Sequence, residues 1–119
     1  MGYRSDVVFA LSKKAFFKYG LLLKKLSFIE DNHDARLVSD NGDVYFKIND
    51  IKWYDSDPDI ANFDALLAEI DSDTDSEVLY GFMRLGEESG DVEEKGYCHE
   101  FDIYYSQSYS QSIESPLNN

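Results

Sequence analysis

The chain has 119 residues, a formal net charge of −13, and 43 % hydrophobic side chains. This length is typical of a single domain, and the composition supplies enough apolar side chains for a core. The acidic balance argues against a general nucleic-acid binder, because affinity for phosphate depends on cationic side chains that release counterions. No apolar run is long enough to span a membrane and the N-terminus lacks a signal-peptide pattern, so we expect a soluble intracellular protein.

The charge is unevenly distributed along the chain. Residues 1–36 carry seven Lys or Arg and four Asp or Glu, whereas the remaining 83 residues carry four basic and twenty acidic side chains. A cationic first segment is therefore followed by a polyanionic remainder. Such a distribution affects how a protein meets its partners and indicates no particular reaction.

The first predicted elements are a strand and an amphipathic helix. Residues 4–11 favour a buried strand, and Ser12 is placed to cap a helix that extends to about Ser27. One face of this helix is apolar and the other is basic. The apolar face carries Ala15, Phe16, Tyr19, Leu22, Leu23 and Leu26, and the basic face carries Lys13, Lys14, Lys18, Lys24 and Lys25. Phe17 and Leu21 fall among the lysines, where a solvated face does not require apolar side chains.

A hairpin and a second helix are predicted next. Residues 35–40 and 43–54 flank Asn41-Gly42, which is a strong signal for a tight β-turn, and we expect a bulge near Asp50. Asp57 followed by Pro58 favours the start of a helix that extends to about Ile70. The sequence thus predicts that a second helix follows the hairpin.

The last third of the chain predicts strands separated by acidic connections. We expect a polar loop at 71–75, a central strand at 77–85, an acidic loop at 86–96 and a last strand at 97–106. A single α+β domain would cover residues 1–106, and residues 107–119 would form a flexible polar tail. The order of elements matches a ferredoxin-like βαββαβ sandwich with an additional C-terminal strand and two helices on one face of an antiparallel sheet.

Acidic residues suggest a cation site at one position in the chain. Asp71, Asp73, Asp75 and Glu77 have the alternate spacing that opens an EF-hand calcium loop. Ser76 stands where that loop needs glycine, and the bidentate glutamate at its end is missing. A solvated acidic turn is the alternative interpretation, and we expect no resident metal or cofactor.

Cys98 and His99 are adjacent, and both are residue types suited to nucleophilic catalysis. Neighbours on a predicted strand point to opposite faces, so a thiolate–imidazolium pair is not expected. No pair of carboxylates is marked as buried. The sequence therefore predicts a protein without enzymatic activity.

Two surfaces are candidates for binding another protein. The acidic loop offers Glu87, Glu88, Asp91, Glu93 and Glu94. The basic helix face offers Phe17 and Leu21 as an apolar patch. A hydrated loop and a solvated lysine face remain the alternative interpretations of these features.

Three segments resemble a group of small acidic proteins encoded by tailed phages and prophages. They are MGYRSDV at 1–7, IKWY at 51–54 and YGFMRLGE at 80–87, and Asp91, Glu93 and Gly96 follow the last of them. Where such proteins usually read Gly-Glu-Asp, this chain has Gly86-Glu87-Glu88, which keeps the charge. The resemblance implies a phage accessory protein that acts in the bacterial cytoplasm by binding a host protein; it identifies no catalytic residue.

Two other functions remain open at this point. The chain could be a structural or assembly protein that self-associates through opposite charges and the patch at Phe17 and Leu21. It could also be a calcium-binding domain that uses the loop at 71–77.

Overall fold

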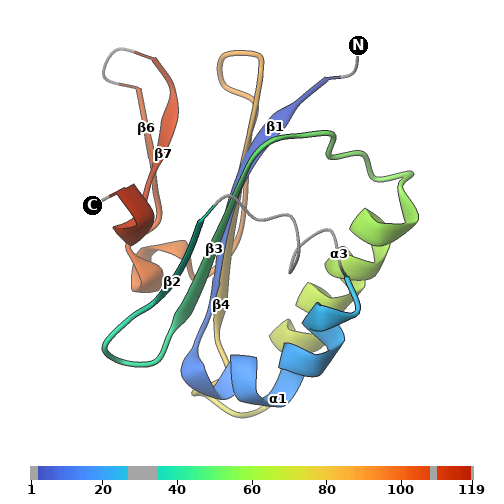
Figure 1. Ribbon diagram of the computed structural model, residues 1–119, viewed down its shortest axis with the longest axis vertical. Helices are drawn as coiled ribbons and strands as arrows, with labels where there is room; N and C mark the ends of the chain where they lie inside the picture. Colours follow the sequence, from blue (N-terminus) through green and yellow to red (C-terminus); the bar gives the residue numbers. More distant parts are fainter. Residues whose placement is uncertain (1–2, 27–34, 108–109, 119) are drawn as a thin grey trace.

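The computed structural model describes residues 3–26, 35–107 and 110–118, and has an α+β fold with two helices and an antiparallel five-stranded sheet (Figure 1). The main elements are β1 (Ser5–Leu11), α1 (Lys13–Lys24), β2 (Ala35–Val38), β3 (Val44–Ile51), α3 (Pro58–Asp71), β4 (Tyr80–Gly86) and β5 (Val92–Gly96). The remaining elements are a 3₁₀ helix η1 (Cys98–Phe101), a two-stranded sheet of β6 (Tyr104–Ser106) and β7 (Ser112–Glu114), and a second 3₁₀ helix η2 (Pro116–Asn118).

Both helices begin at the predicted capping residues. The Ser12 hydroxyl accepts a hydrogen bond from the Ala15 amide at 3.2 Å, and the Asp57 carboxylate accepts one from the Asp59 amide at 3.0 Å. These bonds satisfy amide groups that have no partner within the helix. Helix α1 ends at Lys24, before the predicted end at Ser27, which lies outside the described residues.

The strand order of the sheet is β2-β3-β1-β4-β5, and every neighbouring pair is antiparallel. Strand β4 lies between β1 and β5, which confirms the prediction that it is an interior strand. The predicted bulge near Asp50 is also confirmed, because the pairing of β1 with β3 shifts register there and Asp50 has a φ of 58°. A bulge of this kind bends the strand locally and increases its twist.

The sheet has an apolar core on each face. On one face, α1 and α3 pack against Phe9, Phe46 and Phe82, and the rings of Phe9 and Phe46 stack with centroids 4.9 Å apart. The other face carries Val8, Ala10, Tyr45, Met83 and Leu85. It is covered by side chains that follow β5, namely Cys98, Phe101, Ile103 and Ile113. Because strand neighbours alternate between faces, one run of apolar residues in β1 serves both cores.

Two boundaries in the last third of the sequence were predicted wrongly. The acidic segment 86–96 is not one long loop, because β4 extends through Gly86 and β5 begins at Val92. The fifth strand of the sheet is therefore β5. Residues 97–106 do not form one strand, since the chain turns at Gly96, which has a φ of 75°, and then forms η1. Strand β6 pairs with β7 in a separate two-stranded sheet.

The chain beyond residue 106 packs on the sheet. Ile113 is buried and Leu117 packs against the same cluster as Met83. The sequence places the domain boundary at residue 106, whereas packing in the structure continues to Leu117. Neither helix, nor any other in the described ranges, has the length and apolar character needed to cross a membrane.

Candidate functional site

The acidic segment is the tip of the β4–β5 hairpin, residues 87–91. The Gly86 amide donates to the Asp91 carbonyl at 2.8 Å, which closes the tip on itself. Gln111, from the C-terminal segment, donates to the Glu88 carbonyl at 2.8 Å and accepts from the Gly90 amide at 2.9 Å. Hydrogen bonds to the backbone therefore fix the shape of the tip.

Arg84 organises the base of the hairpin tip. Its guanidinium donates to Asp91 at 2.9 Å and to Glu93 at 3.0 Å, and also reaches the Ser5 hydroxyl at 3.0 Å. The Tyr3 hydroxyl donates to Asp91 at 2.6 Å, so the N-terminal residues are tied to the hairpin. Asp91 and Glu93 are thus occupied within the molecule.

Both carboxylates show this pairing in their pKa values. Hydrogen bonds from Arg84 and Tyr3 lower the pKa of Asp91. Partial burial alone would raise the pKa of Glu93, but hydrogen bonds from Arg84 and Lys95 lower it below its usual value. At neutral pH both groups are charged and are compensated by neighbouring cations.

Three of the five predicted contact acids remain exposed. Glu87 accepts a hydrogen bond from the Arg4 amide at 2.8 Å, and within the described residues Glu88 and Glu94 form no ion pair. Glu93 and Glu94 are strand neighbours and so point to opposite faces of the sheet. The structure consequently does not bring the five acids into one cluster; Glu87 and Glu88 project at the tip, and Glu94 lies further along β5.

The acidic loop that follows α3 folds against the basic helix. Lys18 pairs with Asp73 at 2.5 Å, Lys14 pairs with Asp75 at 2.5 Å, and the Tyr19 hydroxyl donates to Asp73 at 2.6 Å. The bonds from Lys18 and Tyr19 hold the pKa of Asp73 well below its usual value. Of the four carboxylates with calcium-like spacing, those of Asp73, Asp75 and Glu77 therefore pair with lysine ammonium groups.

No group of three or more His, Cys, Asp or Glu side chains in the described parts of the chain is arranged to hold a metal ion. Cys98 is buried in η1, its thiol lies 3.1 Å from the Phe82 carbonyl oxygen, and burial raises its pKa to about 11. A thiol with this pKa is protonated at neutral pH and is a poor nucleophile. The adjacent His99 is exposed and lies on a 3₁₀ helix rather than on the predicted strand.

The apolar residues on the basic helix face are open to solvent. Phe17 is 90 % exposed and Leu21 is 78 % exposed. Their spacing of four residues places them side by side on the outer surface of α1. The C-terminal segment packs on the opposite face of the sheet and does not cover them.

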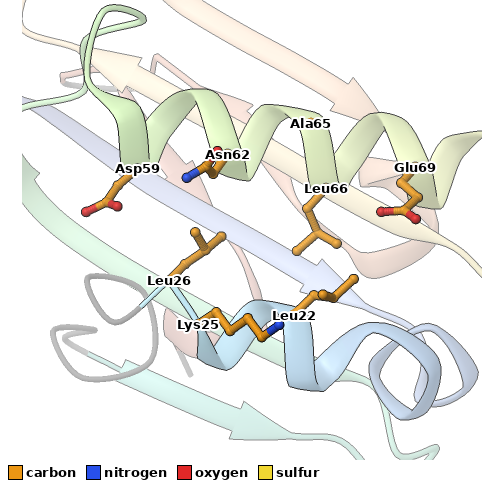
Figure 2. Close-up of a pocket in the computed structure, with 8 residues that line it drawn as sticks. All are labelled: Leu22, Lys25, Leu26, Asp59, Asn62, Ala65, Leu66 and Glu69. Carbon is orange, nitrogen blue, oxygen red and sulfur yellow. The ribbon is translucent and has the colours of Figure 1, made fainter.

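A groove between the two helices was not predicted from the sequence. It has a volume of about 280 Å³, and Figure 2 shows Leu22 of α1, and Leu26 just beyond the end of α1, pointing toward α3, with Leu66 opposite Leu22. Lys25 lies on the α1 side, and the α3 side contributes Asp59, Asn62, Ala65 and Glu69. The sequence does show that the two sides of the groove differ in charge, because α1 has no acidic residue and α3 has no basic residue.

The geometry offers two candidate binding surfaces: the hairpin tip with Glu87 and Glu88, and the helix layer with its groove. Each combines charge with a defined backbone, and each is suited to contact with another macromolecule. Comparison of the chain with protein-family models, curated proteins and solved structures found no match.

Proposed function

We propose that this chain is a non-enzymatic binding protein of phage origin that docks on a basic surface of a bacterial host protein through the tip of the β4–β5 hairpin. One observation carries the proposal. The tip presents Glu87 and Glu88 to solvent, while Tyr3 and Gln111 bond to its backbone and Arg84 binds its Asp91 carboxylate.

A fixed tip favours tight binding. A loop that is already ordered loses little conformational entropy when it meets a partner, so more of the contact energy contributes to affinity. Exposed carboxylates at the tip would pair with Arg or Lys on the target. The net charge of −13 would attract a basic partner over a distance and raise the association rate at low salt.

Phage origin and action in the bacterial cytoplasm rest on the resemblance of residues 1–7, 51–54 and 80–87. A host-takeover or anti-defence role would follow from blocking a host protein. We also assign the strand order β2-β3-β1-β4, with α1 and α3 on one face, to a ferredoxin-like arrangement in which β5 is an added edge strand.

The test compares two variants with matched charge changes. The tip variant E87K/E88K/E94K reverses the exposed acids of the hairpin, two at the tip and one on β5, and the control D40K/D55K/E100K reverses three exposed acids elsewhere. The wild-type protein is immobilised, partners are captured from host lysate and identified by mass spectrometry, and the purified partner is titrated by calorimetry at two salt concentrations.

We expect the tip variant to bind at least about tenfold more weakly than wild type and to show a flatter dependence on salt, since the reversed charges repel a basic target. The control variant should retain most of the affinity, because its reversed charges lie outside the contact. An unchanged affinity of E87K/E88K/E94K for the partner would exclude the hairpin tip as the docking surface.

A further inference from the structure

The two helices that cover one face of the sheet carry opposite charges. Within the helices, every charged side chain of α1 is a lysine and every charged side chain of α3 is a carboxylate. Some of these charges are used inside the molecule, since Lys14 and Lys18 pair with the loop after α3, and Asp64 pairs with Lys95.

The outer surface of the helix layer retains uncompensated charges. In the part of the chain that the structure describes, no ion pair occupies Lys24 or Lys25 on the α1 side, or Asp59 or Glu69 on the α3 side. All four residues are exposed. Among the described residues, one half of the layer therefore presents cations without an ion pair, and the other half presents carboxylates without one.

The two helices also differ in the size of their exposed side chains. Helix α1 presents Phe17 and Leu21, which are almost fully exposed. Helix α3 presents Ala61, Ala65 and Ala68, whose spacing places them along one line on its outer face. Large side chains on one helix and small ones on the other are complementary when the two surfaces meet.

We propose that the helix layer is the contact surface of a two-fold dimer in which α1 of each copy lies on α3 of the other. Figure 2 shows the two helices side by side and antiparallel. A two-fold axis that runs along the groove, in the plane of contact, places each basic helix over an acidic one. An in-plane axis perpendicular to the helices would instead place lysines on lysines, so charge selects the first arrangement.

This axis also fixes the register of the contact. Rotation about an axis parallel to the helices leaves the position of each residue along the helix direction unchanged. In Figure 2 Leu22 lies opposite Leu66 and Leu26 lies opposite Asn62. Leu21, the neighbour of Leu22, therefore lies over the alanine residues on α3 of the second copy. Lys25 lies over the part of that α3 between its two acids, Asp59 and Glu69.

The dimer does not depend on the hairpin tip. The helix layer is separate from the β4–β5 tip in the fold, as Figure 1 shows, and the two surfaces share no residue. The variant E87K/E88K/E94K should therefore leave dimerisation unchanged. Docking through the hairpin tip and dimerisation through the helix layer can therefore be tested separately, and one can fail while the other holds.

The test exchanges charges between the two helices. Variant K24E/K25E has acids on both helices, and variant D59K/E69K has lysines on both. Sedimentation equilibrium at low salt is measured for wild type, for each variant alone and for an equimolar mixture. Circular dichroism verifies that each variant is folded.

Wild type is expected to show a monomer–dimer equilibrium by about 1 mM. Each variant alone should dimerise at least about tenfold more weakly, because like charges then face each other at both α1–α3 contacts of the dimer. The mixture should recover dimers, since the mixed pair places acids on lysines at both contacts. Leu21→Glu, at a residue exposed in the monomer, should weaken the dimer without affecting the fold.

Three outcomes would overturn the proposal. They are a monomeric wild type at that concentration, charge-exchange variants that each dimerise like wild type, and a folded mixture that stays monomeric. If a charge-exchange variant fails to fold, the affinity of the Leu21→Glu dimer tests the contact surface instead. A Leu21→Glu dimer as tight as the wild-type dimer would exclude the helix layer as the contact.

Discussion

Two glycines of the β4–β5 hairpin have the same left-handed backbone in different surroundings. Gly90 has a φ of 85° and a Cβ built on it would meet no atom within 4 Å. Gly96 has a φ of 75°, and its Cβ would lie 2.4 Å from the Tyr80 carbonyl oxygen. That oxygen accepts the Tyr97 amide at 2.8 Å, so it cannot move without loss of the bond that follows the turn.

The pair allows backbone strain to be separated from steric overlap. Gly90→Ala should lower the free energy of unfolding by about 1 kcal/mol, because only the left-handed conformation is disfavoured. Gly96→Ala should lower it by about 3 kcal/mol, since the new methyl group also overlaps the Tyr80 carbonyl. Urea unfolding monitored by fluorescence measures both values. Equal losses for the two variants would contradict a steric role of Gly96.

Among the elements, the β4–β5 hairpin is held by a residue distant in the sequence, Gln111. Gln111 uses both ends of its amide, which donates to the carbonyls of Gly86 and Glu88 and accepts from the Gly90 amide. Gln111→Ala should therefore cost about 1 kcal/mol of stability and accelerate hydrogen exchange of the Gly90 amide. The control Gln107→Ala changes an exposed glutamine. If the Gly90 amide exchanges at the wild-type rate in Gln111→Ala, Gln111 does not hold the tip.

Elements with local start and turn signals were predicted well from the sequence. Ser12 and Asp57 cap the helices through amides two or three residues away, and the Asn41-Gly42 turn joins adjacent strands, so short windows contain the required information. Strand β5 was missed because Glu93, Glu94 and Lys95 are charged and resemble a loop. Its pairing with β4 and the Arg84 contacts, which the sequence does not show directly, place it in the sheet.

The candidate sites could be predicted only in part. Helical periodicity assigned Phe17 and Leu21 to the lysine face, and the structure shows both side chains exposed there. The division of the five hairpin acids into paired and free groups was not, since it depends on which acids Arg84 can reach across the hairpin. The groove between α1 and α3 requires two helices to be placed side by side, which no single window of sequence contains.

Across the whole molecule, part of the charge imbalance is neutralised where the basic helix meets the loop after α3. Asp73 joins the two through Lys18 and Tyr19, and these bonds lower its pKa from the usual 3.8. A carboxyl group with a lowered pKa in the folded state stabilises the fold at pH values above 3.8. This contribution is lost as the pH falls below 3.8 toward the lowered value.

Asp73→Asn tests this contribution. The wild-type protein should have the larger free energy of unfolding at pH 7 and at pH 5, and the difference should shrink steadily below pH 3.8 as the unfolded chain takes up a proton first. Urea unfolding at a series of pH values measures it. The exposed Asp55→Asn is the control and should differ little from wild type throughout. A difference for Asp73→Asn that stays constant down to pH 2 would contradict the role assigned to Asp73.

The cover on the second face of the sheet has a consequence for biosynthesis. The central strand β1 is translated first, but its neighbours β3 and β4 are translated much later, and the side chains that cover Val8, Tyr45 and Met83 follow β5. A nascent chain can therefore close the helix side while the other side of the sheet is still bare. During that interval the growing polypeptide exposes an apolar sheet surface, and an exposed surface of this kind is prone to aggregation.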